Sequence, residues 1–248
     1  MTYQNRLVAH RGYQQRYPEN TIVAYQQAIA AGALNIETDI LLSADLQPVL
    51  YHDPTLKRVS GKRGKVCELS LAQLCQLPAY EPGRLGEQFI SETIAPLSAL
   101  VRLLTMHPQV TAYVEIKKEA IAHAGIPATY AAVTDCLQTV ASQCYLISFD
   151  YAFLAYARDR AWARCGVVLE KWHDLENPDV QAANPDSIFC NYRKIPRKAQ
   201  LKDVTAEIVL YEIADPELAR HWLERGATKI ETFDIGTMIK RLNVLMDQ

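Results

Sequence analysis

Short apolar runs alternate with amphipathic stretches along this chain from one end to the other. The first run, residues 6–10, has the length of a strand, and residues 21–31 carry apolar side chains at helical spacing. Asn20, just before the second stretch, is a residue type that caps helices, and Gly32, just after it, is one that ends them. This alternation predicts an α/β protein with parallel strands.

The same pattern continues to the end of the chain. Further strands are predicted at residues 34–41, 111–116, 144–148, 165–169, 187–191, 207–211 and 228–231. Helices are predicted at residues 127–141 and 151–158, and another begins at Asp215-Pro216 and ends at Gly226. Eight strands with intervening helices favour a TIM (β/α)8 barrel, which needs about 250 residues. We therefore expect residues 1–248 to form a single barrel domain.

One stretch breaks the alternation. A short extended piece at residues 47–51 is followed by residues 53–96, in which Gly and Pro recur and only residues 70–77 indicate a helix. We expect this stretch to form a small subdomain inserted after the second strand.

Composition and charge exclude several classes of protein. The formal net charge of −2 gives no electrostatic reason to expect nucleic acid or an anionic membrane as a partner. The beginning of the chain is polar, and no apolar run approaches the roughly 20 residues of a membrane span. The six cysteines form no metal-ligand cluster, and reduced thiols are expected. These features predict a soluble cytoplasmic protein; a homo-oligomer is compatible with the sequence, which does not fix the oligomeric state.

Carboxylates on two neighbouring strands are the first candidates for chemistry. Glu37 and Asp39 are two residues apart in a predicted strand and therefore point to the same side, and Glu115 has the same setting in the next strand. If the apolar side of each strand packs on helices, the carboxylates point into the barrel. Their oxygens suit one divalent cation, Mg²⁺ or Ca²⁺. The alternative is a solvated edge strand.

Two histidines and two cationic residues lie at the ends of predicted strands or of the short extended piece at residues 47–51. His10 and His52 are candidates for proton transfer, since imidazole titrates near neutral pH. Arg11 and Lys117 could bind the negative charge of a phosphate group. Arg11 could instead pair with Glu19, and Lys117 could neutralise a carboxylate or form a Schiff base.

Taken together, these residues form a known set of motifs. They stand in the order His10-Arg11-Gly12, Pro18-Glu19-Asn20-Thr21, Glu37-Thr38-Asp39, Pro48 to Leu56 and Val114-Glu115-Ile116-Lys117. The chain resembles the glycerophosphodiester phosphodiesterase family over nearly its whole length, in particular its short cytosolic bacterial branch. The resemblance implies a TIM barrel with an insertion, metal ligation by Glu37, Asp39 and Glu115, and acid/base catalysis by His10 and His52. It also implies phosphate contacts from Arg11 and Lys117.

The implied reaction is hydrolysis of small-molecule glycerophosphodiesters, such as glycerophosphocholine and glycerophosphoethanolamine, to glycerol 3-phosphate and an alcohol. Where the family usually has Trp and Asn after the seventh strand, this chain has Tyr211 and Ala214; after the eighth, Phe233 replaces Asp. Phe149 and Tyr211 could form the apolar side of the substrate pocket. Two alternatives remain: a lysophospholipase D-like or sphingomyelinase-type phosphodiesterase on the same fold, and a barrel that binds phosphate or metal without catalysis.

Overall fold

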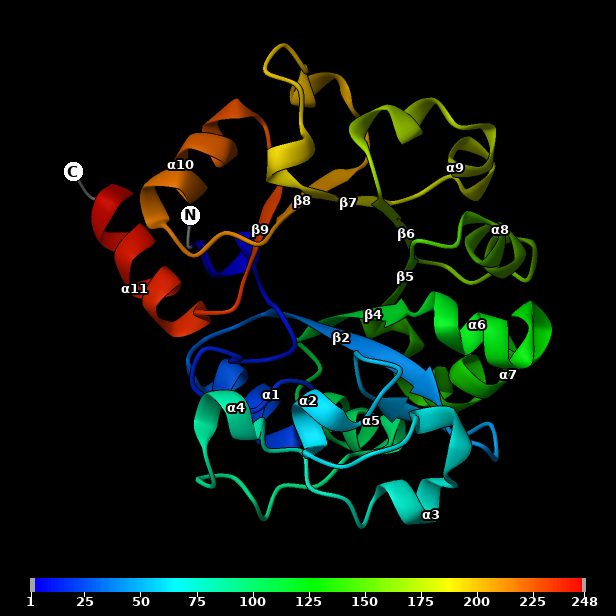
Figure 1. Cartoon of the computed structure of the whole chain (residues 1–248). Helices are drawn as coiled ribbons and strands as arrows, with labels where there is room; N and C mark the ends of the chain where they lie inside the picture. Colours follow the sequence, from blue (N-terminus) through cyan, green and yellow to red (C-terminus); the bar gives the residue numbers. More distant parts are fainter. Residues whose placement is uncertain (1–2, 247–248) are drawn as a thin grey trace.

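The structure is a computed structural model that describes residues 3–246. Within these residues, eight parallel strands close into a barrel in the order β1-β9-β8-β7-β6-β5-β4-β2, and β1 pairs with β2 to complete the ring (Figure 1). The barrel strands are β1 (Leu7–Ala9), β2 (Asn35–Leu42), β4 (Thr111–Ile116), β5 (Cys144–Ser148), β6 (Cys165–Leu169), β7 (Ser187–Asn191), β8 (Glu207–Tyr211) and β9 (Lys229–Thr232). The predicted fold is thus confirmed, with strand ends within two residues of those expected.

Helices surround the barrel and bury the apolar outer side of the strands (Figure 1). They are α1 (Ile22–Ala30), α5 (Leu97–Met106), α6 (Lys118–Ala124), α7 (Ile126–Leu137), α8 (Tyr151–Asp159), α9 (Pro178–Ala183), α10 (Pro216–Arg225) and α11 (Ile235–Met246). Short 3-10 helices are η1 (Tyr3–Arg6), η2 (Val66–Glu68), η3 (Gln138–Gln143), η4 (Trp172–Glu176), η5 (Tyr192–Lys194) and η6 (Leu201–Asp203). The outward position of Thr38, expected from alternation in β2, is confirmed, because its hydroxyl accepts a hydrogen bond from Tyr25 of α1.

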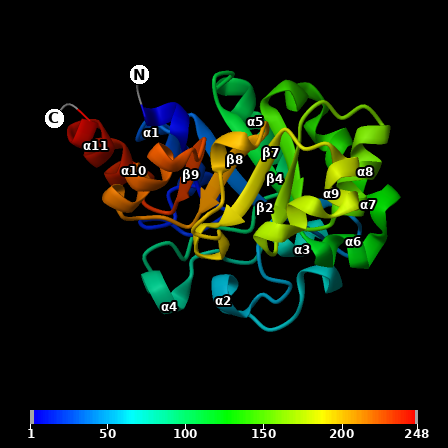
Figure 2. The ribbon, with the colours of Figure 1, turned by 90° about the horizontal axis from the view of Figure 1, so that it is seen from above.

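The insertion follows β3 (Pro48–Leu50), which pairs antiparallel with β2 and lies outside the parallel ring. It carries the short helices α2 (Lys57–Ser60), α3 (Leu71–Leu74) and α4 (Pro82–Leu85) and packs around a small apolar cluster that it shares with β2 and α6. Figure 2 shows α2 and α4 at the end of the barrel toward which the strands point. The insertion therefore borders the rim where loops that follow the strands converge.

Some local predictions were wrong. Thr21, not Asn20, caps α1: the Thr21 hydroxyl accepts a hydrogen bond from the Ala24 amide, while Asn20 adopts a φ of 54°. The helix expected at 70–77 is limited to α3, and the helix expected at 127–141 ends at Leu137, where 3-10 geometry begins. Of the helices around the barrel, α5, α6, α9 and α11 were not predicted.

All six cysteines are free thiols. No helix within residues 3–246 combines the length and apolar character that crossing a membrane requires.

Candidate active site

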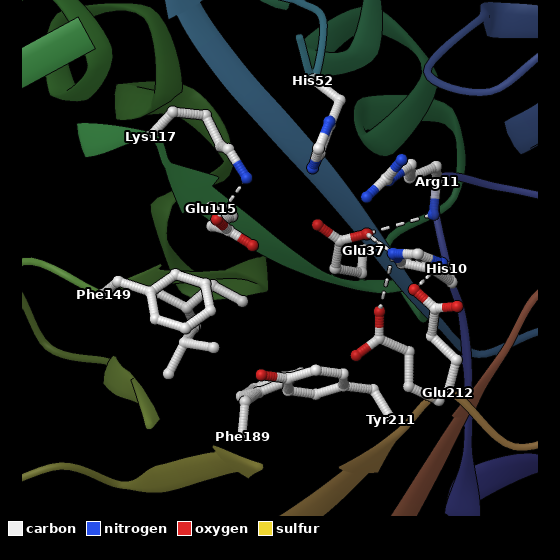
Figure 3. Close-up of a pocket in the computed structure, with 13 residues that line it drawn as sticks. His10, Arg11, Glu37, His52, Glu115, Lys117, Phe149, Phe189, Tyr211 and Glu212 are labelled. Carbon is white, nitrogen blue, oxygen red and sulfur yellow. Dashed lines mark hydrogen bonds and ion pairs between the residues drawn. The ribbon is translucent and has the colours of Figure 1, made fainter. Parts of the chain in front are cut away.

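A pocket of about 210 Å³ opens at the carboxyl ends of the strands (Figure 3). It is lined by His10, Arg11, Glu37, His52, Glu115, Lys117, Ile147, Phe149, Val168, Phe189, Tyr211, Glu212 and Glu231. All the candidate residues singled out from the sequence line this pocket except Asp39, which is buried at 1% exposure.

The three candidate metal ligands converge as the strand alternation predicts. Glu37 and Asp39 project from β2 on the same side, and β2–β4 pairing sets Asp39 opposite Glu115. Each of the three offers an oxygen, and these oxygens lie within 4.8 Å of one another. Burial, followed by the charge of Asp39, raises the pKa of Glu37, and its buried Oε1 has no hydrogen-bond partner within residues 3–246. A hard divalent cation would satisfy this oxygen and relieve the repulsion, so the residues fit such an ion.

Asp39 is held in its ionised form by groups from three segments. Its Oδ2 lies 2.9 Å from Arg11 Nε and accepts a 2.9 Å hydrogen bond from Asn20 Nδ2, and its Oδ1 lies 3.4 Å from Lys117 Nζ. Burial alone would raise the pKa of Asp39, but the charges of Arg11 and Lys117 lower it below the usual range. The amide of Asn20 is thus part of the site rather than of the helix cap.

The ion pairs considered as alternatives from the sequence are both present. Lys117 Nζ lies 2.8 Å from Glu115 Oε1, and Arg11 Nη1 lies 3.1 Å from Glu19 Oε1. Burial opposes the charge of Lys117, but Asp39 and Glu115 outweigh it and raise its pKa above the usual value. A Schiff-base role needs a neutral amine, so this environment argues against it.

His52 is oriented by a carboxylate that the insertion holds in place. Its Nδ1 lies 2.7 Å from Asp53 Oδ1, and Figure 3 shows the far end of the ring pointing into the pocket. Partial burial would raise the pKa of Asp53, but hydrogen bonds from Arg58 and His52 lower it to about 2. An ionised Asp53 requires Nδ1 to carry the proton, which leaves Nε2 as the nitrogen that faces the pocket.

His10 is surrounded by carboxylates, two of which sequence reasoning missed. Its Nε2 lies 3.5 Å from Glu231 and 3.9 Å from Glu37, and its Nδ1 lies 3.6 Å from Glu212. Burial, followed by the charge of Arg11, lowers the pKa of His10 well below its usual value. Lys229 and Glu231 are two residues apart in β9, as Glu37 and Asp39 are in β2, so alternation in the last strand could have revealed Glu231.

Aromatic side chains form the remaining wall. Phe149 and Tyr211 line the pocket as expected, and Phe189, not noticed in the sequence, lines it too (Figure 3). Trp172 does not line the pocket and packs against the outer core.

Gly12 fixes the turn that carries His10 and Arg11 into the pocket. It has a φ of 85°, and a Cβ there would lie 2.7 Å from the backbone carbon of Ala24. We expect Gly12→Ala to lower the free energy of unfolding by about 2 kcal/mol or more. The substitution would force alanine into the left-handed region and would also place its Cβ against the backbone of Ala24. Urea unfolding measures this change. Gly83→Ala is the control, because no atom lies within 4 Å of the Cβ that this substitution would add. Equal effects of the two substitutions on the free energy of unfolding would contradict this explanation.

An α/β barrel with such a set of side chains at the carboxyl ends of its strands has the architecture typical of TIM-barrel enzymes. The chain belongs to the glycerophosphoryl diester phosphodiesterase family, whose family model matches residues 10–229. The resemblance noted in the sequence is thereby confirmed.

Curated relatives align with part of the chain. Glycerophosphodiester phosphodiesterase 1 of Mus musculus is 35% identical over 113 residues, which are 46% of this chain and 34% of the mouse protein. Glycerophosphodiester phosphodiesterase of Caldanaerobacter subterraneus subsp. tengcongensis is 33% identical over 120 residues, 48% of each chain. The chain thus spans about a third to a half of the length of the curated relatives it matches.

Solved structures show the same fold over nearly the whole chain. An Oleispira antarctica phosphodiesterase in complex with the product sn-glycerol-3-phosphate has a TM-score of 0.84 at 21% identity and covers 98% of this chain and 97% of its own. A putative glycerophosphoryl diester phosphodiesterase from Silicibacter pomeroyi has a TM-score of 0.83 at 20% identity, covering 97% and 93%.

Proposed function

We propose that this protein hydrolyses glycerophosphodiesters to glycerol 3-phosphate and an alcohol, in a reaction that depends on one divalent cation, Mg²⁺ or Ca²⁺. The observation that supports this most is the meeting of three carboxylates, two cationic side chains and two imidazoles at one pocket. Family membership and the glycerol 3-phosphate bound by the Oleispira relative support the same substrate class. Glycerophosphocholine and glycerophosphoethanolamine are representative substrates.

Glu37, Asp39 and Glu115 are the proposed metal ligands. A divalent cation bound there would polarise a phosphate oxygen and neutralise charge that develops during phosphoryl transfer. The carboxylates themselves are positioned before binding, because adjacent strands fix their spacing and Arg11 and Asn20 fix the orientation of Asp39.

Arg11 and Lys117 are the proposed phosphate-binding residues. Both side chains line the pocket and both are nearly buried, with 13% and 12% exposure. Buried cations held in place by carboxylates stabilise added negative charge without reorganising, which is the requirement for stabilising a phosphoryl transition state. Phe149 and Tyr211 are proposed to contact the apolar carbon atoms of the substrate.

His10 and His52 are the proposed acid/base pair. One imidazole accepts a proton from the attacking water or glycerol hydroxyl, and the other donates a proton to the departing alkoxide. Asp53 sets the tautomer of His52, so that its Nε2 is the atom that exchanges a proton in the pocket.

Product analysis tests the proposed reaction. With Mg²⁺ or Ca²⁺ present, the protein is expected to convert glycerophosphoethanolamine into glycerol 3-phosphate and ethanolamine. The reaction is monitored by ³¹P NMR. Lysophosphatidylcholine is expected to react much more slowly, because its acyl chain would extend from the pocket of about 210 Å³ into water. Release of phosphoethanolamine, or faster turnover of the lysophospholipid, would refute the proposal.

A further inference from the structure

Two acidic side chains on the β8–β9 side of the pocket have no role in the mechanism proposed above. Glu231 is 3% exposed, and within residues 3–246 its carboxylate accepts no hydrogen bond. It lies 3.5 Å from His10 Nε2, and His10, Glu37 and Glu231 each offer a polar atom within 4.8 Å of the other two. Glu212 has a side chain 45% exposed and lines both this pocket and an adjoining hollow of about 260 Å³. Glu231 thus lies deep in the pocket and Glu212 at its mouth.

Cationic side chains lie beside two of the other carboxylates of the pocket, Asp39 and Glu115. Asp39 faces Arg11 and Lys117, Glu115 pairs with Lys117, and Glu37 accepts a hydrogen bond from the Arg11 amide, 3.1 Å away. No arginine or lysine within residues 3–246 forms an ion pair with Glu212 or Glu231. Within the described residues, Glu212 and Glu231 therefore lack the cationic neighbours that Asp39 and Glu115 have on the opposite side.

His10 lies between these two carboxylates but does not satisfy them. It is 7% exposed, and its Nδ1 has no hydrogen-bond partner within the described residues, since Glu212 is 3.6 Å away. Burial, followed by the charge of Glu212, raises the pKa of Glu231 well above its usual value. A positive charge that enters this part of the pocket would stabilise the ionised form of both carboxylates.

An aromatic surface completes this part of the pocket. Tyr211, which precedes Glu212 in the chain, lies along the wall next to Phe189 (Figure 3). Aromatic faces together with carboxylates bind ammonium groups, primary or quaternary, through cation–π and ionic attraction. A hydrated metal ion gains little from such a wall, which favours an organic cation here.

We propose that Glu212 and Glu231 select substrates whose alcohol portion carries an ammonium group. The inference rests on the proposed phosphodiesterase function and adds to it which alcohol is preferred and which residues choose it. The alcohol end of the substrate then lies toward β8 and β9, with its positive charge between the two carboxylates and Tyr211. Neutral alcohols lose this attraction, and anionic head groups are repelled.

The test compares two substrates of nearly the same shape. Glycerophosphoethanolamine carries an ammonium group where glycerophosphopropanol has a methyl group, so the ratio of their kcat/KM values reports recognition of the charge. We expect a ratio of about 10 or more in the wild-type protein. Glu231→Gln should lower the ratio about 10-fold, and Glu212→Gln, at the solvated mouth, about 3-fold. Glu224→Gln on exposed α10 removes the same charge and should leave the ratio unchanged.

The outcomes separate this inference from the proposed function. Turnover of both substrates with a ratio near one, or with a ratio that neither Glu231→Gln nor Glu212→Gln changes, overturns the inference alone. No turnover of either substrate overturns the proposed function and the inference with it. If Glu231→Gln fails to fold, Glu212→Gln decides. Calorimetric titration with Mg²⁺ adds a check on the number of ions bound per chain. If the wild-type protein bound two Mg²⁺ ions and Glu231→Gln bound one, Glu231 would be a metal ligand, and the inference would be overturned.

Discussion

His52→Ala is expected to reduce kcat on glycerophosphoethanolamine at least about 100-fold, the usual contribution of a general acid or base. The imidazole is held by Asp53 with one nitrogen directed into the pocket. His10→Ala should have an effect of similar size. The measurement is kcat at saturating substrate and cation, since binding of the cation by the carboxylates does not require either imidazole.

A control and a check of the fold make this prediction decisive. His173→Ala removes a histidine whose side chain is 74% exposed and distant from the pocket lining, and it should leave kcat unchanged. Circular dichroism should give the wild-type spectrum for all three variants. Near-normal kcat in a folded His52→Ala protein would show that His52 transfers no proton.

Removal of the divalent cation is expected to have the largest effect, a loss of activity of about 10³-fold or more. Several kcal/mol of charge stabilisation would disappear, and each 1.4 kcal/mol corresponds to a tenfold change in rate. Dialysis against a chelator measures this loss, and re-addition of Mg²⁺ or Ca²⁺ separately identifies the ion that restores activity. Glu37→Gln should produce a comparable loss that added cation does not restore, because Glu37 projects the unpartnered Oε1 into the proposed metal site.

The fold is expected to survive both treatments. Glu37 is buried, and no arginine or lysine within residues 3–246 forms an ion pair with it. Replacing its carboxylate by the neutral amide in Glu37→Gln should therefore not lower the free energy of unfolding measured in urea. Full activity after exhaustive chelation, or in Glu37→Gln, would mean that phosphoryl chemistry in this pocket uses the side chains alone.

Much of the site could be predicted because strand geometry is local. The two-residue period that sets Glu37 and Asp39 on one side of β2 needs no knowledge of the rest of the molecule. The same holds for Glu115 in β4, and parallel pairing of β2 with β4 then brings the three carboxylates together. His10 and Arg11 follow for a similar reason, since residues that end barrel strands gather at one rim.

The remainder depends on contacts between distant segments. Arg58 of α2 donates hydrogen bonds to both Asp53 and Glu19, and Glu19 in turn binds Arg11, so the insertion supports both sides of the site. An irregular segment gives no periodic signal from which these partners could be inferred. Asn20 was wrongly expected to cap a helix: its Oδ1, the atom that would accept a capping hydrogen bond, accepts hydrogen bonds from the Asp39 amide and the Tyr25 hydroxyl instead, and only the tertiary structure decides between these partners.

The most direct test of the central claim is a crystal structure with glycerol 3-phosphate and the activating cation bound. Our account predicts that the cation is coordinated by Glu37, Asp39 and Glu115, with the phosphate group in contact with Arg11 and Lys117. The phosphate should also lie between the rings of His10 and His52. A cation or phosphate bound outside this pocket, with these side chains still paired to one another as they are here, would contradict the account.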